Sequence, residues 1–271
     1  MKIYQIDTFT THVFKGNPAA VVPLESWPED SIMQNIAAEN NLSETAFFVE
    51  RDDYYELRWF TPTQEVPLCG HATLASAFVI FEELNYQAPQ IRFVTQVGDL
   101  FTSRTDNLLT LDFPATPYQV CEDVSAPLVK GLGKTPSTVL VSAESDPNYY
   151  AIFDSEDDVV ETQPDLYILE TLHPYGVVVN APGSQYDCVS RYFAPSYGIP
   201  EDPVTGSIHC VLIPYWASRL GKTKVNAAQL SERTGELFCE VNGSRVYISG
   251  YATKYLEGEI TISSSDTPFS S

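Results

Sequence analysis

The stretch LCGHATLASAFVIF, from Leu68 to Phe81, decides the fold of this chain. It begins with a Cys-Gly-His tripeptide and continues as an apolar run, and Glu82 is the first charge after it. A helix that is apolar on nearly every face must be surrounded by other elements, so the stretch predicts a buried central helix over 71–84. Gly70 is the expected N-cap. The first amide N–H groups of such a helix are expected to form an anion site.

The composition is that of a folded, β-rich globular chain. Of its 271 residues 44% are hydrophobic and 19% charged, enough for one large domain or two of ordinary size. Sixteen Tyr, fourteen Phe and nineteen Pro favour strands and turns. The formal net charge of −21 repels phosphate groups. We therefore expect no nucleic acid and no membrane among the partners.

Cysteine usage and the N-terminus favour a cytoplasmic protein. The five cysteines are odd in number, are scattered and contain no C-x-x-C, which fits a reducing compartment better than a disulfide framework. Residues 1–7 resemble a strand rather than a signal peptide. No apolar run reaches the length of a membrane span. The cysteines are Cys69, Cys121, Cys188, Cys210 and Cys239.

Alternating apolar and polar residues predict strands in both halves of the chain. The expected strands are 2–9, a buried strand ending at 22, 42–49, 54–60, 91–95, 98–104, 108–113, 138–142, 149–153, 176–180, 237–241, 245–251 and 257–262. A helix over 31–39, capped by Asp30, is expected between the second and third of these. The five carboxylates in 154–161 indicate a solvated surface. The residues from Ser263 are expected to be frayed.

The sequence also contains an internal echo, which predicts two similar domains. Arg58-Trp59-Phe60-Thr61-Pro62 matches Arg191-Tyr192-Phe193-Ala194-Pro195, and an acidic loop, a glycine and an apolar helix follow each motif. The second helix is expected over 207–220, kinked or divided at Pro214. The proline-rich connector 114–117 separates predicted domains 1–114 and 118–262, and the tail 263–271 is allowed to return to the first. If the halves face each other, both helix N-termini open on one cleft.

Three side chains are candidates for chemistry, and each has an ordinary structural alternative. Glu44 stands in an otherwise apolar strand, where loss of solvent raises a carboxyl pKa and suits a general acid/base. It could equally be an edge-strand glutamate or a partner of Arg58. His71 lies just inside the predicted helix, where a neutral ring is expected, but could be a buried structural histidine. Asp202 precedes a proline and could be a turn residue.

Several familiar sites have no support in the sequence. The four histidines show no H-x-x-x-H or H-x-E pairing, and Cys69-Gly70-His71 lacks the nearby C-x-x-C of zinc deaminases, so no metal is expected. Neither G-x-x-x-x-G-K-[ST] nor G-x-G-x-x-G occurs, so no nucleotide cofactor is expected. A G-x-S-x-G nucleophile elbow is also missing.

Five motifs in order resemble the phenazine-biosynthesis isomerase family, the PhzF-like proteins, over essentially the whole chain. They are Asp7-Thr8-Phe9, the run from Phe14 to Val21 with Gly16-Asn17-Pro18, Asn41-Leu42-Ser43-Glu44-Thr45-Ala46-Phe47, Cys69-Gly70-His71-Ala72-Thr73, and the run from Glu201 to Ser207. The resemblance implies an α+β fold like diaminopimelate epimerase. In that fold two pseudo-symmetric domains each wrap a barrel-like sheet around a central helix.

The resemblance also implies roles at the matching positions. Glu44 matches the acid/base glutamate, and His71 and Asp202 match residues that flank and orient the substrate. Substrate-binding positions, some of which hold a carboxylate, are Gly70, Ser207, Gly206, Thr205 and Asn17. The family implies no cofactor and no metal, a small-molecule carboxylate substrate and a homodimer. Its best-known member moves a double bond in a dihydro-hydroxyanthranilate by proton transfer.

Two alternatives stay open at the level of sequence. Diaminopimelate-type epimerases use two thiols, one on each face of the carbon. Cys69 stands at one such place, but Pro203-Val204 occupies the other, so a thiol racemase lacks half its machinery. Cys69 is then interpreted as a small packed residue. The second alternative is a scaffold that binds a small carboxylate or another protein without catalysis.

Overall fold

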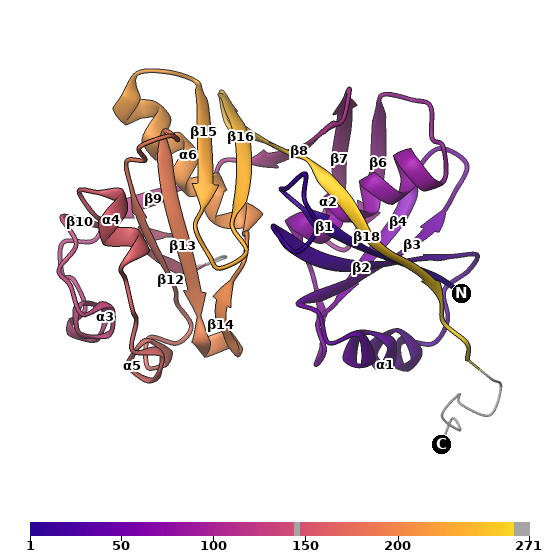
Figure 1. Ribbon diagram of the computed structural model, residues 1–271, viewed down its shortest axis with the longest axis horizontal. Helices are drawn as coiled ribbons and strands as arrows, with labels where there is room; N and C mark the ends of the chain where they lie inside the picture. The colour runs from indigo at the N-terminus through magenta and orange to yellow at the C-terminus, as the bar shows by residue number, and fades with distance from the viewer. Residues whose placement is uncertain (144–146, 263–271) are drawn as a thin grey trace. The chain divides into compact units, whose positions relative to one another are not determined.

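The computed structural model describes residues 1–143 and 147–262, which form two compact units (Figure 1). Unit 1 is Met1–Asp112 together with the chain from Ser249 onward, and unit 2 is Phe113–Ile248. The chain passes from one unit to the other inside β8 (Leu108–Pro114) and again inside β17 (Arg245–Gly250).

Unit 1 wraps a mixed sheet around one helix, α2 (Gly70–Phe78). This helix packs against β1, β2, β3 and β18. A second helix, α1 (Asp30–Asn40), connects the parallel strands β2 and β3 and packs Met33 against Phe47 and Phe60. The strands are β1 (Lys2–Thr8), β2 (Asn17–Leu24), β3 (Glu44–Glu50), β4 (Tyr55–Phe60), β5 (Glu65–Val66), β6 (Gln90–Thr95), β7 (Gly98–Thr105) and β18 (Ala252–Glu259).

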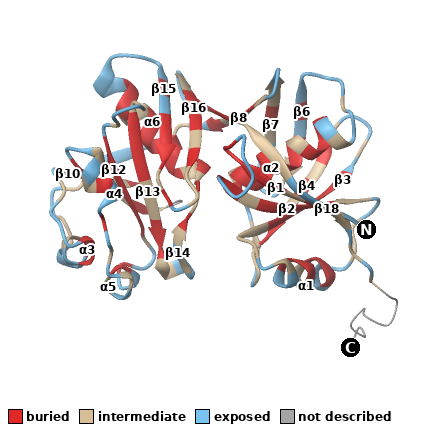
Figure 2. Cartoon of the chain, viewed as in Figure 1, coloured by how far each residue is buried: buried red, intermediate tan, exposed pale blue. Residues whose placement is uncertain are grey.

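The central helix of unit 1 is buried, as its sequence predicts. Every residue of 71–77 is buried, and Figure 2 shows α2 largely in the colour of buried residues. The hydroxyl of Thr73 donates to the carbonyl of Cys69 at 2.5 Å, which satisfies a polar group inside the apolar surroundings. The predicted N-cap is wrong by one residue. Cys69 has extended backbone angles (φ −147°, ψ 114°) and is the N-cap, while Gly70 is already helical.

The end of this helix departs from the α-helical prediction over 71–84. The last residues, Val79–Glu83, form a π-helix, η1, whose side chains up to Phe81 are buried. In α1 the predicted N-cap is also wrong by one residue: Glu29 is the N-cap and Asp30 is the first helical residue. The sequence could not place this boundary, because only the backbone angles distinguish an N-cap from the first helical residue.

Unit 2 repeats the plan around α6 (Gly206–Leu220). Nine of the fifteen residues of α6 are buried, the helix packs against β15 and β16, and it continues through Pro214 rather than dividing there. The strands are β9 (Tyr118–Val120), β10 (Thr138–Ser142), β11 (Asn148–Ile152), β12 (Gly176–Ala181), β13 (Cys188–Ala194), β14 (Ile199–Asp202), β15 (Lys224–Gln229) and β16 (Gly235–Asn242). The short helices are α3 (Ala126–Leu132), α4 (Glu156–Val160), α5 (Leu166–Glu170) and the 3₁₀ turn η2 (Pro195–Tyr197).

The pairing order confirms that the two halves are alike. In unit 1, β2 runs parallel to β3, β3 antiparallel to β4, and β4 parallel to β6. In unit 2, β11, β12, β13 and β15 repeat this series, and each central helix precedes the last strand of its series. The matched arginines also correspond. Arg58 forms two hydrogen bonds with Glu65, and Arg191 forms two with Glu201.

Two expectations from the sequence are corrected by the strand pairing and the helices. The last strand was expected over 257–262 in the second domain, but β18 spans Ala252–Glu259 and pairs with β1 in unit 1. Alternation of apolar and polar residues predicts that a strand exists, but it does not predict which strand of which sheet it pairs with. The acidic segment 154–161 contains α4, whose Val159 is fully buried, so only part of it is solvated. The expected frayed tail lies outside the described residues.

No helix among residues 1–143 and 147–262 is long and apolar enough to cross a membrane.

Candidate functional site

Three polar side chains of unit 1 meet at the N-terminus of α2. Cys69 is the N-cap, His71 is the second helical residue, and Glu44 is the first residue of β3. The ring of His71 lies between the other two: Nδ1 is 3.5 Å from Sγ of Cys69, and Nε2 is 3.2 Å from Oε2 of Glu44. The sequence predicted Glu44 and His71 as partners in one site, and the structure brings these two together.

Neither ordinary interpretation of Glu44 holds. The strand β3 pairs with β2 on one side and β4 on the other, so Glu44 does not belong to an edge strand. Arg58 pairs with Glu65 and Asp30 instead. Among the residues that the structure describes, His71 lies within ion-pair distance of the Glu44 carboxylate and no lysine or arginine does.

Burial shapes the acidity of Glu44. Its side chain is 14% exposed, and Oε2 is buried and accepts no hydrogen bond from any residue that the structure describes. The contact with His71 has the distance of an ion pair but not the alignment of a hydrogen bond. Loss of solvent raises the pKa of Glu44, while hydrogen bonds from Ser43 and Cys69 oppose the rise.

Ser43 and Asn17 lie beside this cluster. The hydroxyl of Ser43 is 3.5 Å from Nε2 of His71 and donates to Oδ1 of Asn17 at 3.4 Å. Asn17 is buried at the start of β2, and its carbonyl accepts a bond from Thr8. The sequence predicted Asn17 as a site residue but not Ser43, although Ser43 directly precedes Glu44 and could have been found by that adjacency.

The backbone conformation just before Asn17 requires a glycine at position 16. Its φ is +63°, and a Cβ there would lie 1.9 Å from the carbonyl oxygen of Thr8. Only glycine fits this position, which explains the Gly-Asn-Pro sequence at the start of β2.

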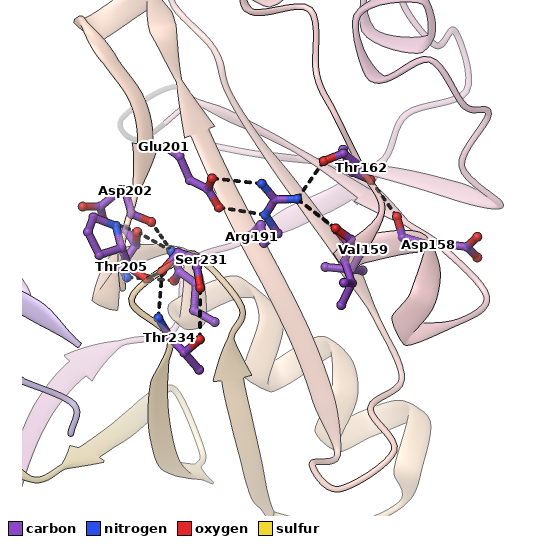
Figure 3. Close-up of polar contacts among 12 residues, drawn as sticks. Asp158, Val159, Thr162, Arg191, Glu201, Asp202, Thr205, Ser231 and Thr234 are labelled. Atoms are coloured by element: carbon purple, nitrogen blue, oxygen red, sulfur yellow. Dashed lines mark hydrogen bonds and ion pairs between the residues drawn. The ribbon is translucent and has the colours of Figure 1, made fainter. Parts of the chain in front are cut away.

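The second cluster lies at the N-terminus of α6 in unit 2. Thr205 is the N-cap, and its hydroxyl donates a short hydrogen bond to the carboxylate of Asp202, the last residue of β14 (Figure 3). Gly206 and Ser207 are the first two helical residues. The start Thr205-Gly206-Ser207 thus corresponds to Cys69-Gly70-His71 in unit 1. Asp202 is buried, and its carboxylate accepts this hydrogen bond from the N-cap residue Thr205.

Gln229 fixes the loop between Asp202 and Thr205. Its Oε1 accepts from the amide of Thr205 at 2.8 Å, and its Nε2 donates to the carbonyl of Asp202 at 2.7 Å. The side chain is fully buried. Nearby, Ser231 donates to the carbonyl of Pro203 (Figure 3). The sequence did not predict either residue, because β15 was not expected and nothing in the local pattern points to partners 24 to 28 residues earlier in the chain.

The predicted site residues therefore form two clusters, one in each unit. Glu44, His71, Gly70 and Asn17 belong to unit 1, and Asp202, Thr205, Gly206 and Ser207 belong to unit 2. The shared cleft between them stays a prediction.

Comparison with known proteins gives the family. The family model described as phenazine biosynthesis-like protein matches residues 6–258. The chain belongs to the phenazine biosynthesis-like family. It is 46% identical to an uncharacterized isomerase of Pseudomonas aeruginosa over 260 residues, 96% of this chain and 98% of that one. A crystal structure of a PhzF-family phenazine biosynthesis protein from Enterococcus faecalis superposes with a TM-score of 0.91 at 42% identity, covering 96% of this chain and 99% of that one.

The phenazine biosynthesis-like family has the fold of diaminopimelate epimerase, as the sequence predicted. A probable proline racemase from Agrobacterium radiobacter has the same architecture, with a TM-score of 0.65 at 11% identity over 98% of this chain and 94% of that one. At this low sequence identity the structural similarity is evidence for the fold alone. Curated relatives bear the name isomerase, which supports an isomerase role at the level of the family.

Proposed function

We propose that the protein is a cofactor-independent isomerase that transfers a proton between two carbons of a small carboxylate. The reaction is a double-bond shift similar to that of trans-2,3-dihydro-3-hydroxyanthranilate isomerase. One observation carries the proposal: Glu44 presents a buried carboxylate oxygen that accepts no hydrogen bond from residues 1–143 and 147–262 and lies 3.2 Å from the imidazole of His71. A carboxylate held in this way can take a proton from one carbon and return it to another.

His71 supports the charge that develops on the substrate. The ring lies in the first turn of α2 beside Glu44, where it can form a hydrogen bond with a substrate. Ser43 and Cys69 flank the ring and fix its plane. In this proposal His71 places the substrate, and Glu44 alone carries the proton.

Asp202 and the start of α6 form a second candidate binding cluster, in unit 2. The amides of Gly206 and Ser207 belong to the first turn of a fifteen-residue helix, where an anionic group is favoured. The Thr205 hydroxyl and the Gln229 amide keep the Asp202 loop in one conformation. The carboxylate of the substrate is proposed to bind the first turn of one of the two central helices.

A two-thiol racemisation is a weaker candidate. Cys69 is the N-cap of α2, but the corresponding N-cap of α6 is Thr205, which has no thiol. The alternative of a binding protein without catalysis predicts retention of a small acid with no turnover. We propose that the protein is cytoplasmic and forms a homodimer. Gel filtration with light scattering tests the homodimer, and fractionation of cells tests the compartment.

The test is a turnover assay on trans-2,3-dihydro-3-hydroxyanthranilate and on a panel of small unsaturated carboxylic acids. In deuterated water, an isomerase releases product that carries solvent deuterium to the extent that the Glu44 proton exchanges. Binding of these acids without any product would favour the non-catalytic alternative. Inversion of a saturated α-carbon, without a double-bond shift, would favour a racemase.

A further inference from the structure

We propose that Cys69 is a positioning residue: its thiol donates a hydrogen bond to Nδ1 of His71 and holds the neutral ring in the tautomer that carries its proton on Nε2. Cys69 is 7% exposed, and its Sγ is 3.5 Å from Nδ1, whereas Glu44 faces Nε2. A neutral imidazole carries one proton, and the partners of the two nitrogens decide which of them holds it. The tautomer therefore follows from what faces each nitrogen.

Two oxygen atoms that act as acceptors face Nε2. Oε2 of Glu44 is 3.2 Å away, and the ionised carboxylate repels a lone pair on Nε2. Oγ of Ser43 is 3.5 Å away, and its single proton is donated to Oδ1 of Asn17 at 3.4 Å. Ser43 also forms a hydrogen bond with Glu44, and this bond too draws the hydroxyl proton away from the ring. The favourable arrangement therefore has N–H at Nε2 and a lone pair at Nδ1.

The lone pair on Nδ1 requires a donor, which a protonated thiol supplies. Sγ of Cys69 is buried and lies within 4.8 Å of a carboxylate oxygen of Glu44; loss of solvent and a nearby negative charge both favour the thiol over the thiolate. Cys69 also donates a hydrogen bond to the Glu44 carboxyl group, which a thiolate cannot do, so the thiol proton is shared between two acceptors. The N-terminus of α2 acts in the opposite direction, but it contributes only about half an elementary charge.

The corresponding N-cap of unit 2 supports this role for Cys69. Neither Cys69 nor Thr205 caps its own helix with its side chain. The hydroxyl of Thr205 donates instead to the carboxylate of Asp202. Threonine at this position usually accepts a hydrogen bond from a helix amide. In each unit the N-cap side chain is thus directed at a candidate site residue.

The tautomer limits what His71 can do in the proposed reaction. With a proton on Nε2 and the thiol at Nδ1, the ring can donate a hydrogen bond to a substrate but cannot accept a proton from it at Nε2. Glu44 is then the proton acceptor, and Cys69 acts through His71. This consequence rests on the proposed function, whereas the tautomer does not.

Nitrogen NMR of the full chain at pH 7.5, with nitrogen-15 in its four histidines, measures the tautomer directly. The resonances of His71 are identified by their loss in His71→Gln. His209 is an internal reference, because its Nδ1 is 2.7 Å from the carbonyl of Thr205 and must carry the proton of a neutral ring. We expect the opposite pattern for His71, with the lone-pair resonance at Nδ1 and the N–H resonance at Nε2. A proton on Nδ1 of His71, or on both nitrogens, would overturn the proposal.

Three variants test the hydrogen bond from the thiol. Cys69→Ala removes the donor, so the Nδ1 resonance should move to the position of a lone pair without a hydrogen bond, and Cys69→Ser should return it toward wild type. Cys121→Ser, at a partly exposed thiol of unit 2, is the matched control and should change neither nitrogen. The same Nδ1 resonance in wild type and Cys69→Ala would exclude the hydrogen bond. Circular dichroism establishes that each variant is folded, and the wild-type spectrum carries the test if Cys69→Ala is not.

Turnover on a confirmed substrate tests the positioning role. Cys69→Ala should lower kcat/KM by about 2- to 10-fold, the factor that corresponds to one hydrogen bond, and Cys69→Ser should stay near wild type. Equal kcat/KM in Cys69→Ala and wild type would refute the positioning role. The expected spectra without turnover of any acid would instead count against the proposed function and leave the tautomer established.

Discussion

His209 makes the stability of unit 2 depend on pH in a way that can be calculated. This residue of α6 is fully buried; Nδ1 is 2.7 Å from the carbonyl of Thr205, and Nε2 has no partner among the described residues. Burial lowers the pKa of His209 from 6.5 to about 4. The ring is therefore neutral in the native protein at neutral pH, and Nδ1 donates to Thr205.

The sign of the effect follows from the direction of the shift. Above pH 7.5 the His209 ring is neutral in both the folded and the unfolded chain, so its titration does not change the free energy of unfolding. As the pH falls through 6.5, the unfolded chain takes up a proton that the folded chain refuses, so the free energy of unfolding decreases until about pH 4. The loss is about 2 kcal/mol at pH 5 and about 3 kcal/mol at its limit, since one pKa unit corresponds to roughly 1.4 kcal/mol.

Urea unfolding of wild type and His209→Met at pH 7.5 and pH 5 measures this term. Methionine leaves no titrating group, so the pH-dependent loss should be smaller in the variant by about 2 kcal/mol. The neighbouring buried substitution Ile208→Val is the control, and its cost of about 0.5–1.5 kcal/mol should be the same at both pH values. Equal pH dependence in wild type and His209→Met would refute the reasoning.

Two further substitutions test the supports of the clusters. Gly16→Ala should destabilise the protein by about 2 kcal/mol or more, because alanine at φ +63° is strained and its Cβ would meet the Thr8 carbonyl; thermal unfolding that matches wild type would contradict this. Gln229→Leu should cost about 1–3 kcal/mol, because it leaves buried backbone groups of Asp202 and Thr205 without their partner. It should also raise KM, whereas Gln34→Leu, which removes a single bond to the Thr61 carbonyl, should leave KM unchanged; equal KM values in the two variants would exclude a positioning role for Gln229.

The sequence predicted the central helices because their composition alone requires burial. A run such as Ala72-Thr73-Leu74-Ala75 predicts a helix that is covered on all sides, and the matching arginine motifs reveal the repeat. The sequence could not predict which sheet edge β18 joins, because strand alternation carries no information on partners. Strand β18 belongs to unit 1 because it pairs with β1, which lies at the opposite end of the sequence.

The clusters were predictable to the extent that their residues share a local motif. His71 and Thr205 mark helix starts, and Glu44 stands out as a charge in an apolar strand. The contacts of Cys69 with the ring of His71, and of Gln229 with Thr205, depend on side-chain directions that only the folded chain defines.

The role of Glu44 as proton carrier is tested most directly by Glu44→Gln on a confirmed substrate, with turnover and binding measured together. Glutamine nearly preserves the shape of the side chain but cannot accept the proton, so kcat should fall by about 10²- to 10⁴-fold while substrate affinity stays near that of wild type. Glu65→Gln, which changes a carboxylate paired with Arg58, serves as the control and should keep its kcat. Full activity of Glu44→Gln would contradict the account and move the search for the proton carrier to Asp202 or Cys69.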